Sequence, residues 1–186
     1  MGTEIVEKRG LAMALNNCAF VSTETIHEDR AKAFCFLMDV SMLGVGCGFD
    51  VKGAGKIDVR KPSDSEYTYT IEDTRESWVE SLKLLVESYF DGSKTVNFDY
   101  SKVRPAGLPI KGFGGVSSGP EPLADLHKDL RKVLNKNIGK PLSITTIVDI
   151  MNLIGKCVVA GNVRRTAEIV FGDANSDEYL DLKNYK

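Results

Sequence analysis

Residues 16–22 read NNCAFVS, a short apolar run that follows two asparagines and ends at a serine. This pattern predicts a buried β-strand over Cys18–Val21. Residues 44–51 read GVGCGFDV, in which three alternating glycines let the backbone approach another backbone or a ligand closely before a second strand begins. The two stretches therefore predict two strands joined through a helical segment.

Long helical patterns separate the strand candidates. Residues 27–42 carry apolar side chains on more than one helical face, and the helix that begins at Ser143 is apolar nearly all round, which is typical of helices inside a layered protein. Another helix begins at a capping box formed by Asp73 and Glu76. Strands alternating with long helices predict an α/β fold with at least partly parallel strands. The remaining elements are expected at residues 66–71, 95–100, 118–137, 166–171 and 176–185.

The composition of the 186-residue chain excludes several classes of protein. Apolar residues make up 42% and charged residues 27%, and the formal net charge is −2, so neither a disordered tail nor a DNA-, RNA- or membrane-binding surface is expected. No apolar run of about 18 residues and no leader-like segment occurs, which favours a cytoplasmic location. The cysteines form no C-x-x-C pair, and neither histidine has a partner at metal-ligand spacing, so no metal site is predicted. These residues are Cys18, Cys35, Cys47, Cys157, His27 and His127.

Two loops carry residues suited to phosphate binding. Glycines of the first loop, residues 110–119, expose backbone N–H groups ahead of a helix, and Arg104 and Lys111 add full positive charges. The second loop places Arg164 and Arg165 after a buried helix. Each loop is equally compatible with an ordinary solvated turn, and Cys18 with a structural thiol.

Four separated strings resemble the adenosylcobalamin-dependent, class II ribonucleotide reductases of the monomeric ribonucleoside-triphosphate type. They occur in the same order as in that family and extend over nearly the whole chain. The strings are ALNNCAFV at 14–21, DTRESWV at 73–79, VRP at 103–105 with GFGG at 112–115 and SGP at 118–120, and NLIGK at 152–156 with VVAGNVRR at 158–165.

The resemblance implies a partial ten-stranded α/β barrel with a small helix-containing insertion. Residues 1–51 and 99–186 would belong to the catalytic barrel and residues 52–98 to the insertion. In the family, two cysteines on neighbouring strands reduce the ribose, and Cys18 falls on the first of them. Asn17 and Gly46 would lie beside the substrate. The oxidised cysteine pair would be re-reduced by a thioredoxin-like dithiol.

The resemblance also assigns both loops to allosteric control. A dNTP effector would bind the first loop, and the second would lie between effector and substrate base, coupling the two sites. The implied effector residues are Arg104, Lys111, Gly112, Gly114 and Ser118. The implied specificity-loop residues are Gly161, Asn162, Arg164 and Arg165.

The insertion resembles one that replaces the helix of a second subunit, so the full-length protein is expected to be a monomer. The family's Asn-x-Cys-x-Glu radical segment, its second redox cysteine and its C-terminal cysteine pair have no counterpart in this sequence. We therefore expect an incomplete barrel, inactive alone. The alternatives are a non-catalytic dNTP-binding module and a fragment of a dimeric or other-class reductase. The residues leave diphosphate and triphosphate substrates open, and the resemblance favours the triphosphate.

Overall fold

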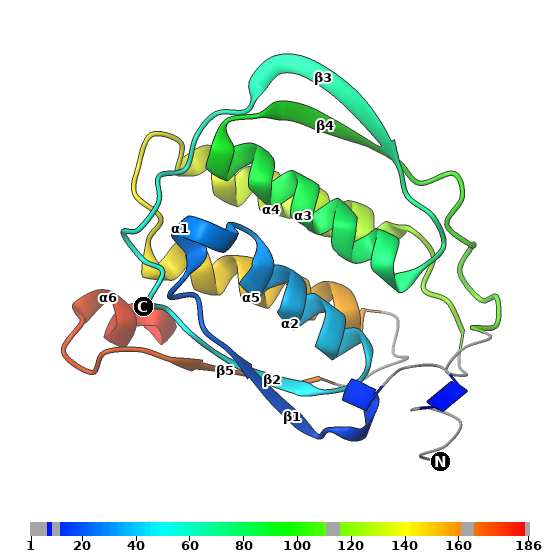
Figure 1. The fold of residues 1–186 in the computed structure, drawn as a ribbon, viewed down its shortest axis with the longest axis horizontal. Coiled ribbons are helices and arrows are strands. Elements are labelled where there is room, and N and C mark those ends of the chain that lie inside the picture. Colours follow the sequence, from blue (N-terminus) through cyan, green and yellow to red (C-terminus); the bar gives the residue numbers. More distant parts are fainter. Residues whose placement is uncertain (1–6, 9–11, 111–115, 161–165, 185–186) are drawn as a thin grey trace.

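The structure is a computed structural model that describes residues 7–8, 12–110, 116–160 and 166–184. Its elements form four layers, with a parallel sheet at one side, two layers of helices, and a two-stranded sheet at the other side (Figure 1). The α/β class is as expected. The described residues form a three-stranded and a two-stranded sheet, and a ten-stranded barrel is not shown among them.

The larger sheet contains β1 (Cys18–Val21), β2 (Gly46–Asp50) and β5 (Glu168–Phe171) in the order β1-β2-β5. Both strand pairs are parallel, which confirms that prediction. Because the pairing is parallel, the carboxyl ends of all three strands lie at one edge of the sheet. β5 is shorter than the stretch 166–171 predicted for it.

Two helices, α2 (Lys32–Met42) and α5 (Ile144–Val159), cover one face of this sheet (Figure 1). Both are covered in turn by the second helical layer, which explains why their sequences are apolar on several sides. Ser143 caps α5 as predicted, since its hydroxyl accepts the amide hydrogen of Thr146 at 3.1 Å.

The continuous helix predicted over residues 27–42 is wrong. A short helix α1 (Ile26–Asp29) precedes α2, and Arg30 between them has a φ of 35°. This left-handed conformation is unfavourable for a residue with a side chain. The Arg30 guanidinium pairs with Asp91 at 2.9 Å, so a contact with a distant helix end accompanies the break.

The outer layers contain α3 (Arg75–Asp91), α4 (Glu121–Lys136), β3 (Ser63–Thr70) and β4 (Lys94–Asp99). Thr74, rather than the predicted Asp73, caps α3 by accepting the amide hydrogen of Ser77 at 3.2 Å. Gly92 ends α3 in the left-handed conformation, which glycine adopts without strain. The remaining short elements are η2 (Ala12–Leu15), α6 (Asp177–Leu180), which Ser176 caps, and η3 (Asp181–Lys183).

Candidate functional site

Cys18 begins β1 and lies on the face of the sheet opposite the helices. Its side chain is exposed, and so are the large apolar side chains of Phe20, Ile169 and Phe171 on the same face. The expectation of a buried strand is therefore wrong, because β1 packs on its helix side only. Parallel sheets are normally covered on both faces, so this open face is suited to bind a ligand or further protein.

Gly46 lies directly beside Cys18 in the parallel register, and its amide donates to the carbonyl of Asn17 at 3.0 Å. Among the described residues, a β-carbon on Gly46 would meet only the carbonyl oxygens of Asn17 and Ala167, at 3.7 and 3.6 Å. The strand thus presents bare backbone next to the thiol, and a ligand can approach it closely.

Gly48, two residues further along β2, is covered instead. The rings of Phe20 and Phe171 meet edge to face with centroids 5.8 Å apart, and a β-carbon on Gly48 would lie 3.1 to 3.3 Å from these two side chains and Ile169. At one end of the open face, apolar side chains therefore cover the backbone of Gly48. At the other end, beside Cys18, the described side chains leave the backbone of Gly46 uncovered.

The other three cysteines differ from Cys18 because they pack into the protein. Burial is the largest cause that raises the pKa of Cys47 to about 11, and that of Cys35 and of Cys157 to about 12. A thiol that stays protonated is a poor nucleophile. Of the four cysteines, Cys18 is the one whose side chain is exposed.

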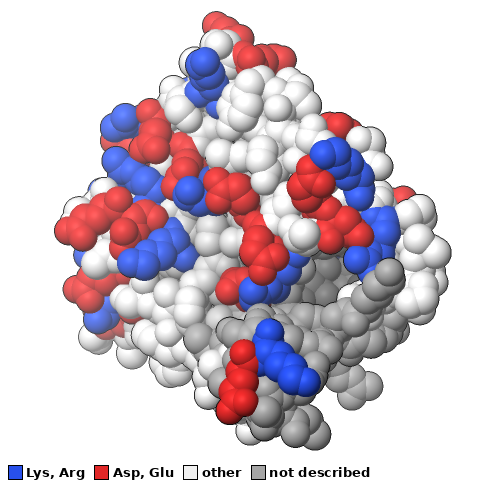
Figure 2. Space-filling view, turned by 45° about the vertical axis from the view of Figure 1, so that its right-hand side comes forward, with Lys and Arg blue, Asp and Glu red and all other residues white. Residues whose placement is uncertain are grey.

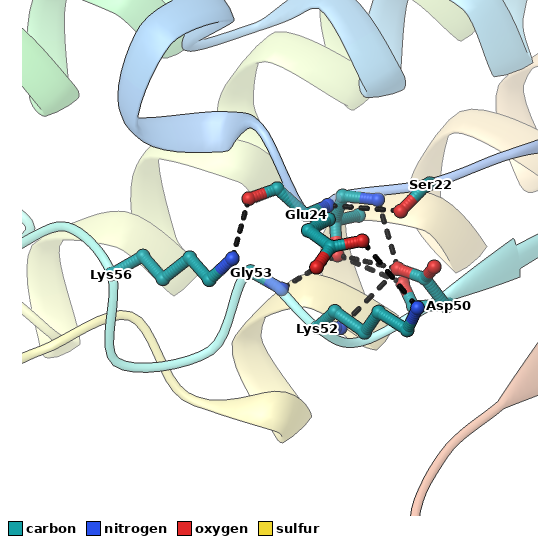
Figure 3. Close-up of polar contacts among 7 residues, drawn as sticks. Ser22, Glu24, Asp50, Lys52, Gly53 and Lys56 are labelled. Atoms are coloured by element: carbon teal, nitrogen blue, oxygen red, sulfur yellow. Dashed lines mark hydrogen bonds and ion pairs between the residues drawn. The ribbon is translucent and has the colours of Figure 1, made fainter.

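Asp50 and Thr23 join the carboxyl ends of β1 and β2, a cluster that the sequence analysis missed (Figure 3). Oδ1 of Asp50 accepts the Thr23 amide at 2.9 Å and the Thr23 hydroxyl at 3.0 Å, and Thr23 Oγ1 accepts the Gly53 amide at 2.8 Å. Burial alone would raise the pKa of Asp50, but hydrogen bonds from Ser22, Thr23 and Lys52 outweigh it and lower that pKa. The cluster holds the two strands together beside the open face.

Arg104 is held by Asp73, which precedes α3. Its Nε donates to Asp73 Oδ2 at 2.6 Å, and its Nη1 donates to the carbonyl of Pro109 at 2.8 Å. Ser118 is half-buried and precedes α4, whose N-cap is Pro120, so this helix begins later than the predicted stretch 118–137. The other loop candidates lie outside the described residues. They are Lys111, Gly112, Gly114, Gly161, Asn162, Arg164 and Arg165.

The last turns of α2 contact both the start of α3 and the segment before β5. Arg75 Nη1 lies 2.8 Å from Asp39 Oδ1. Thr166 Oγ1 donates to the Val45 carbonyl at 2.8 Å and to Ser41 Oγ at 3.3 Å. One helix end thus contacts elements next to both predicted nucleotide loops.

His127 lies in helix α4 and is only 2% exposed, so it is a buried helix residue. Because Ser81 Oγ donates to the Trp78 carbonyl at 2.7 Å, it accepts from His127 Nε2 at 3.0 Å, and Tyr100 then donates to Nδ1 at 2.7 Å. Burial first, and the charge of Arg131 second, lower the pKa of His127 to about 3. The imidazole is therefore a neutral core residue.

Among the described residues, no group of three or more His, Cys, Asp or Glu side chains could hold a metal ion. None of the helices within those ranges has the length and apolar character that crossing a bilayer requires.

Residues 49–134 match the family model for the insertion domain of B12-dependent ribonucleotide reductase. This range begins near residue 52, where the sequence suggested an insertion, and runs past residue 98 into α4. The chain is 29% identical to a crystal structure of a B12-dependent, class II ribonucleotide reductase, with a TM-score of 0.74 over 92% of this chain and 31% of that one.

Curated relatives match the whole chain. An adenosylcobalamin-dependent ribonucleoside-triphosphate reductase from Euglena gracilis is 58% identical over 100% of this chain and 26% of its own length. A probable enzyme of the same name from Dictyostelium discoideum is 53% identical over 100% and 27%. The Lactobacillus leichmannii enzyme is 41% identical over 98% and 32%. The chain spans between a quarter and a third of the length of these relatives, and over its own length it is similar to the B12-dependent class II ribonucleotide reductases.

Proposed function

We propose that the full-length protein reduces ribonucleoside triphosphates to deoxyribonucleotides, and that Cys18 is one of the two thiols that supply the electrons. The observation that carries this proposal is the position of Cys18. It is the exposed cysteine of the chain, and it stands beside the bare backbone of Gly46 on an open sheet face. Relatives named as such reductases match the chain over its whole length.

The thiol chemistry balances with one further cysteine. Two thiols lose two electrons and two protons and form a disulfide, while the 2′-hydroxyl of the ribose leaves as water and a hydrogen takes its place. Cys18 supplies one thiol, and an external thioredoxin-like dithiol reduces the disulfide afterwards. The rigid β1–β2 pairing and the Asp50–Thr23 hydrogen bonds hold the Cys18 strand in place.

Adenosylcobalamin enters the proposal through the names of the relatives, and we assign no described residue to hold it. When bound, it supplies the radical chemistry. In this proposal the chain holds the Cys18 thiol at the open face, and the nucleotide approaches it beside Asn17 and Gly46.

We further propose that a dNTP effector binds near Arg104 together with Lys111, Gly112, Gly114 and Ser118. The loop with Gly161, Asn162, Arg164 and Arg165 would relay its identity to the substrate. Residues 1–51 and 99–186 would be barrel and 52–98 insertion. The full-length protein would be a monomer, because the insertion resembles one that replaces the helix of a second subunit; its helix α3 packs against α2 of the same chain.

Substitution of Cys18 in the full-length protein tests the proposal. Cys18→Ser is expected to abolish multiple-turnover reduction of a ribonucleoside triphosphate with a dithiol, while nucleotide binding is retained. Cys35→Ser is the matched control and is expected to retain turnover, since Cys35 lies on α2 with its thiol against the Val79 carbonyl of α3. Full turnover by Cys18→Ser would overturn the proposal.

A further inference from the structure

The Arg104–Asp73 pair joins two segments that lie 31 residues apart. Both side chains are about a third exposed, at 27% for Arg104 and 34% for Asp73, so water and dissolved ions reach the pair. The Nη1 contact with the Pro109 carbonyl attaches the same guanidinium to the loop that follows it. The guanidinium of Arg104 therefore makes two contacts with the protein, to Asp73 and to Pro109, and the side chain remains partly accessible to solvent.

The geometry of the pair limits how Arg104 can bind a phosphate. A guanidinium grips two phosphate oxygens side-on through Nε and Nη2, or end-on through its two terminal nitrogens. In this structure Nε already donates to Asp73 Oδ2. A phosphate can therefore use the side-on fork only after the Asp73 carboxylate has left it.

The surroundings of the pair do not attract an anion by net charge. Lys102 pairs with Glu72, and Arg75 pairs with Asp39 and Glu76, so these two cations also have carboxylate partners. On the face shown in Figure 2, basic and acidic side chains are interspersed, and the described residues form no broad basic patch there. A nucleotide polyanion that binds these described cations must therefore displace carboxylates.

We propose that Asp73 is an internal competitor that occupies Arg104 until the phosphates of the effector displace it. The inference rests on the proposed effector site. Asp73 immediately precedes Thr74, the N-cap of α3, so its release from Arg104 removes one contact of the segment that leads into the helix packed on α2, while the Glu72 amide stays hydrogen-bonded to Ser77 Oγ. Asp73 thereby sets the effector concentration at which the site fills and links filling to the position of α3.

The test measures binding of each of the four dNTPs, and of inorganic tripolyphosphate, to the full-length protein by calorimetry. Asp73→Asn is expected to bind both kinds of ligand roughly two- to five-fold more tightly, the range that corresponds to release of a partly exposed ion pair. Asp73→Ser gives the same direction and serves if the first variant is poorly folded. Tripolyphosphate shows that the gain comes from the phosphates rather than from the base.

Glu72→Gln is the matched control, since it removes the neighbouring carboxylate with the same change of charge but leaves Arg104 paired. It is expected to change affinity by less than half as much. In an Arg104→Gln background, Asp73→Asn should give no gain. If Arg104→Gln weakens binding while Asp73→Asn leaves it unchanged or weakens it, or if Glu72→Gln strengthens it equally, the inference is overturned and the effector site stands. If Arg104→Gln leaves binding unchanged, the effector site itself is wrong.

Discussion

The carboxyl group of Glu168 on β5 packs directly against Gly155 of α5. A β-carbon on Gly155 would lie only 2.0 Å from Oε1 of Glu168. Both carboxyl oxygens are buried, and within the described part of the chain neither has a hydrogen-bond partner. Burial raises the pKa of Glu168 to about 7. This carboxyl group is thus most compatible with the fold when it is protonated.

The first prediction concerns the pH dependence that Glu168 imposes on stability. Its folded-state pKa lies above the unfolded value of 4.5, so its contribution is complete below pH 4.5 and is lost as the pH rises through 7. Glu168→Gln should therefore stabilise the protein at pH 8, by on the order of 1 to 2 kcal/mol after allowance for partial exposure, and have little effect at pH 5. Thermal melting at the two pH values measures this. Glu28→Gln, at an exposed carboxylate, is the control, and an equal effect of both variants would contradict the prediction.

The second prediction concerns Gly155 itself. In most helices Gly→Ala stabilises by up to about 1 kcal/mol. Gly155→Ala should instead displace the Glu168 carboxyl group and destabilise the protein at pH 5, where that group is protonated and seated. In a Glu168→Ala background the same change should become stabilising. Denaturation of the four proteins of this cycle gives the coupling energy, and additive effects would show that the two residues are independent.

The third prediction concerns His127, whose folded-state pKa of about 3 lies below its unfolded value of 6.5. The neutral ring supports the fold above pH 6.5, and this support is lost as the pH falls from 6.5 towards 3. His127→Gln should cost about 2 to 4 kcal/mol at pH 7.5, because it removes the stack on Phe98 and strains two hydrogen bonds. It should cost less at pH 4.5. His27→Gln, at the exposed histidine, should change stability little at either pH.

The fourth prediction separates the two glycines of β2. Gly48→Ala pushes a methyl group into the Phe20–Phe171 pair and should cost about 1 to 2 kcal/mol. Gly46→Ala meets only ordinary contacts and should change stability by less than about 0.5 kcal/mol. If substrate approaches the backbone there, Gly46→Ala should nevertheless lower turnover in the full-length protein. Melting temperatures and turnover, measured side by side, give both results, and normal turnover of Gly46→Ala would place the substrate elsewhere.

Much of the fold could be predicted because its signals are local. The strand at Cys18–Val21 and the start of a helix at Ser143 each depend on a few adjacent residues. The break at Arg30 could not be predicted, because its ion-pair partner Asp91 lies 61 residues further along the chain. An apolar strand likewise carries no information on which of its faces is covered, so the exposure of Cys18 needed the structure.

The same difference between local sequence signals and contacts of distant residues applies to the candidate site. Cys18, Gly46 and Arg104 belong to recognisable strings, and the structure describes all three. The sequence marked Asp73 only as a helix cap and did not single out Asp50, because their contacts with Arg104 and Thr23 join residues about 30 positions apart in the chain. The hydrogen bonds of His127 could not be predicted for the same reason, since its partners Ser81 and Tyr100 come from other elements.

Two elements contact the end of α2. Arg75 of α3 pairs with Asp39, and Thr166 before β5 donates a hydrogen bond to Ser41. If α2 slid along its axis, it would strain the ion pair with α3 and the hydroxyl contact ahead of β5 in the same movement. The start of α3 and the segment that leads into β5 are therefore positioned relative to each other through α2.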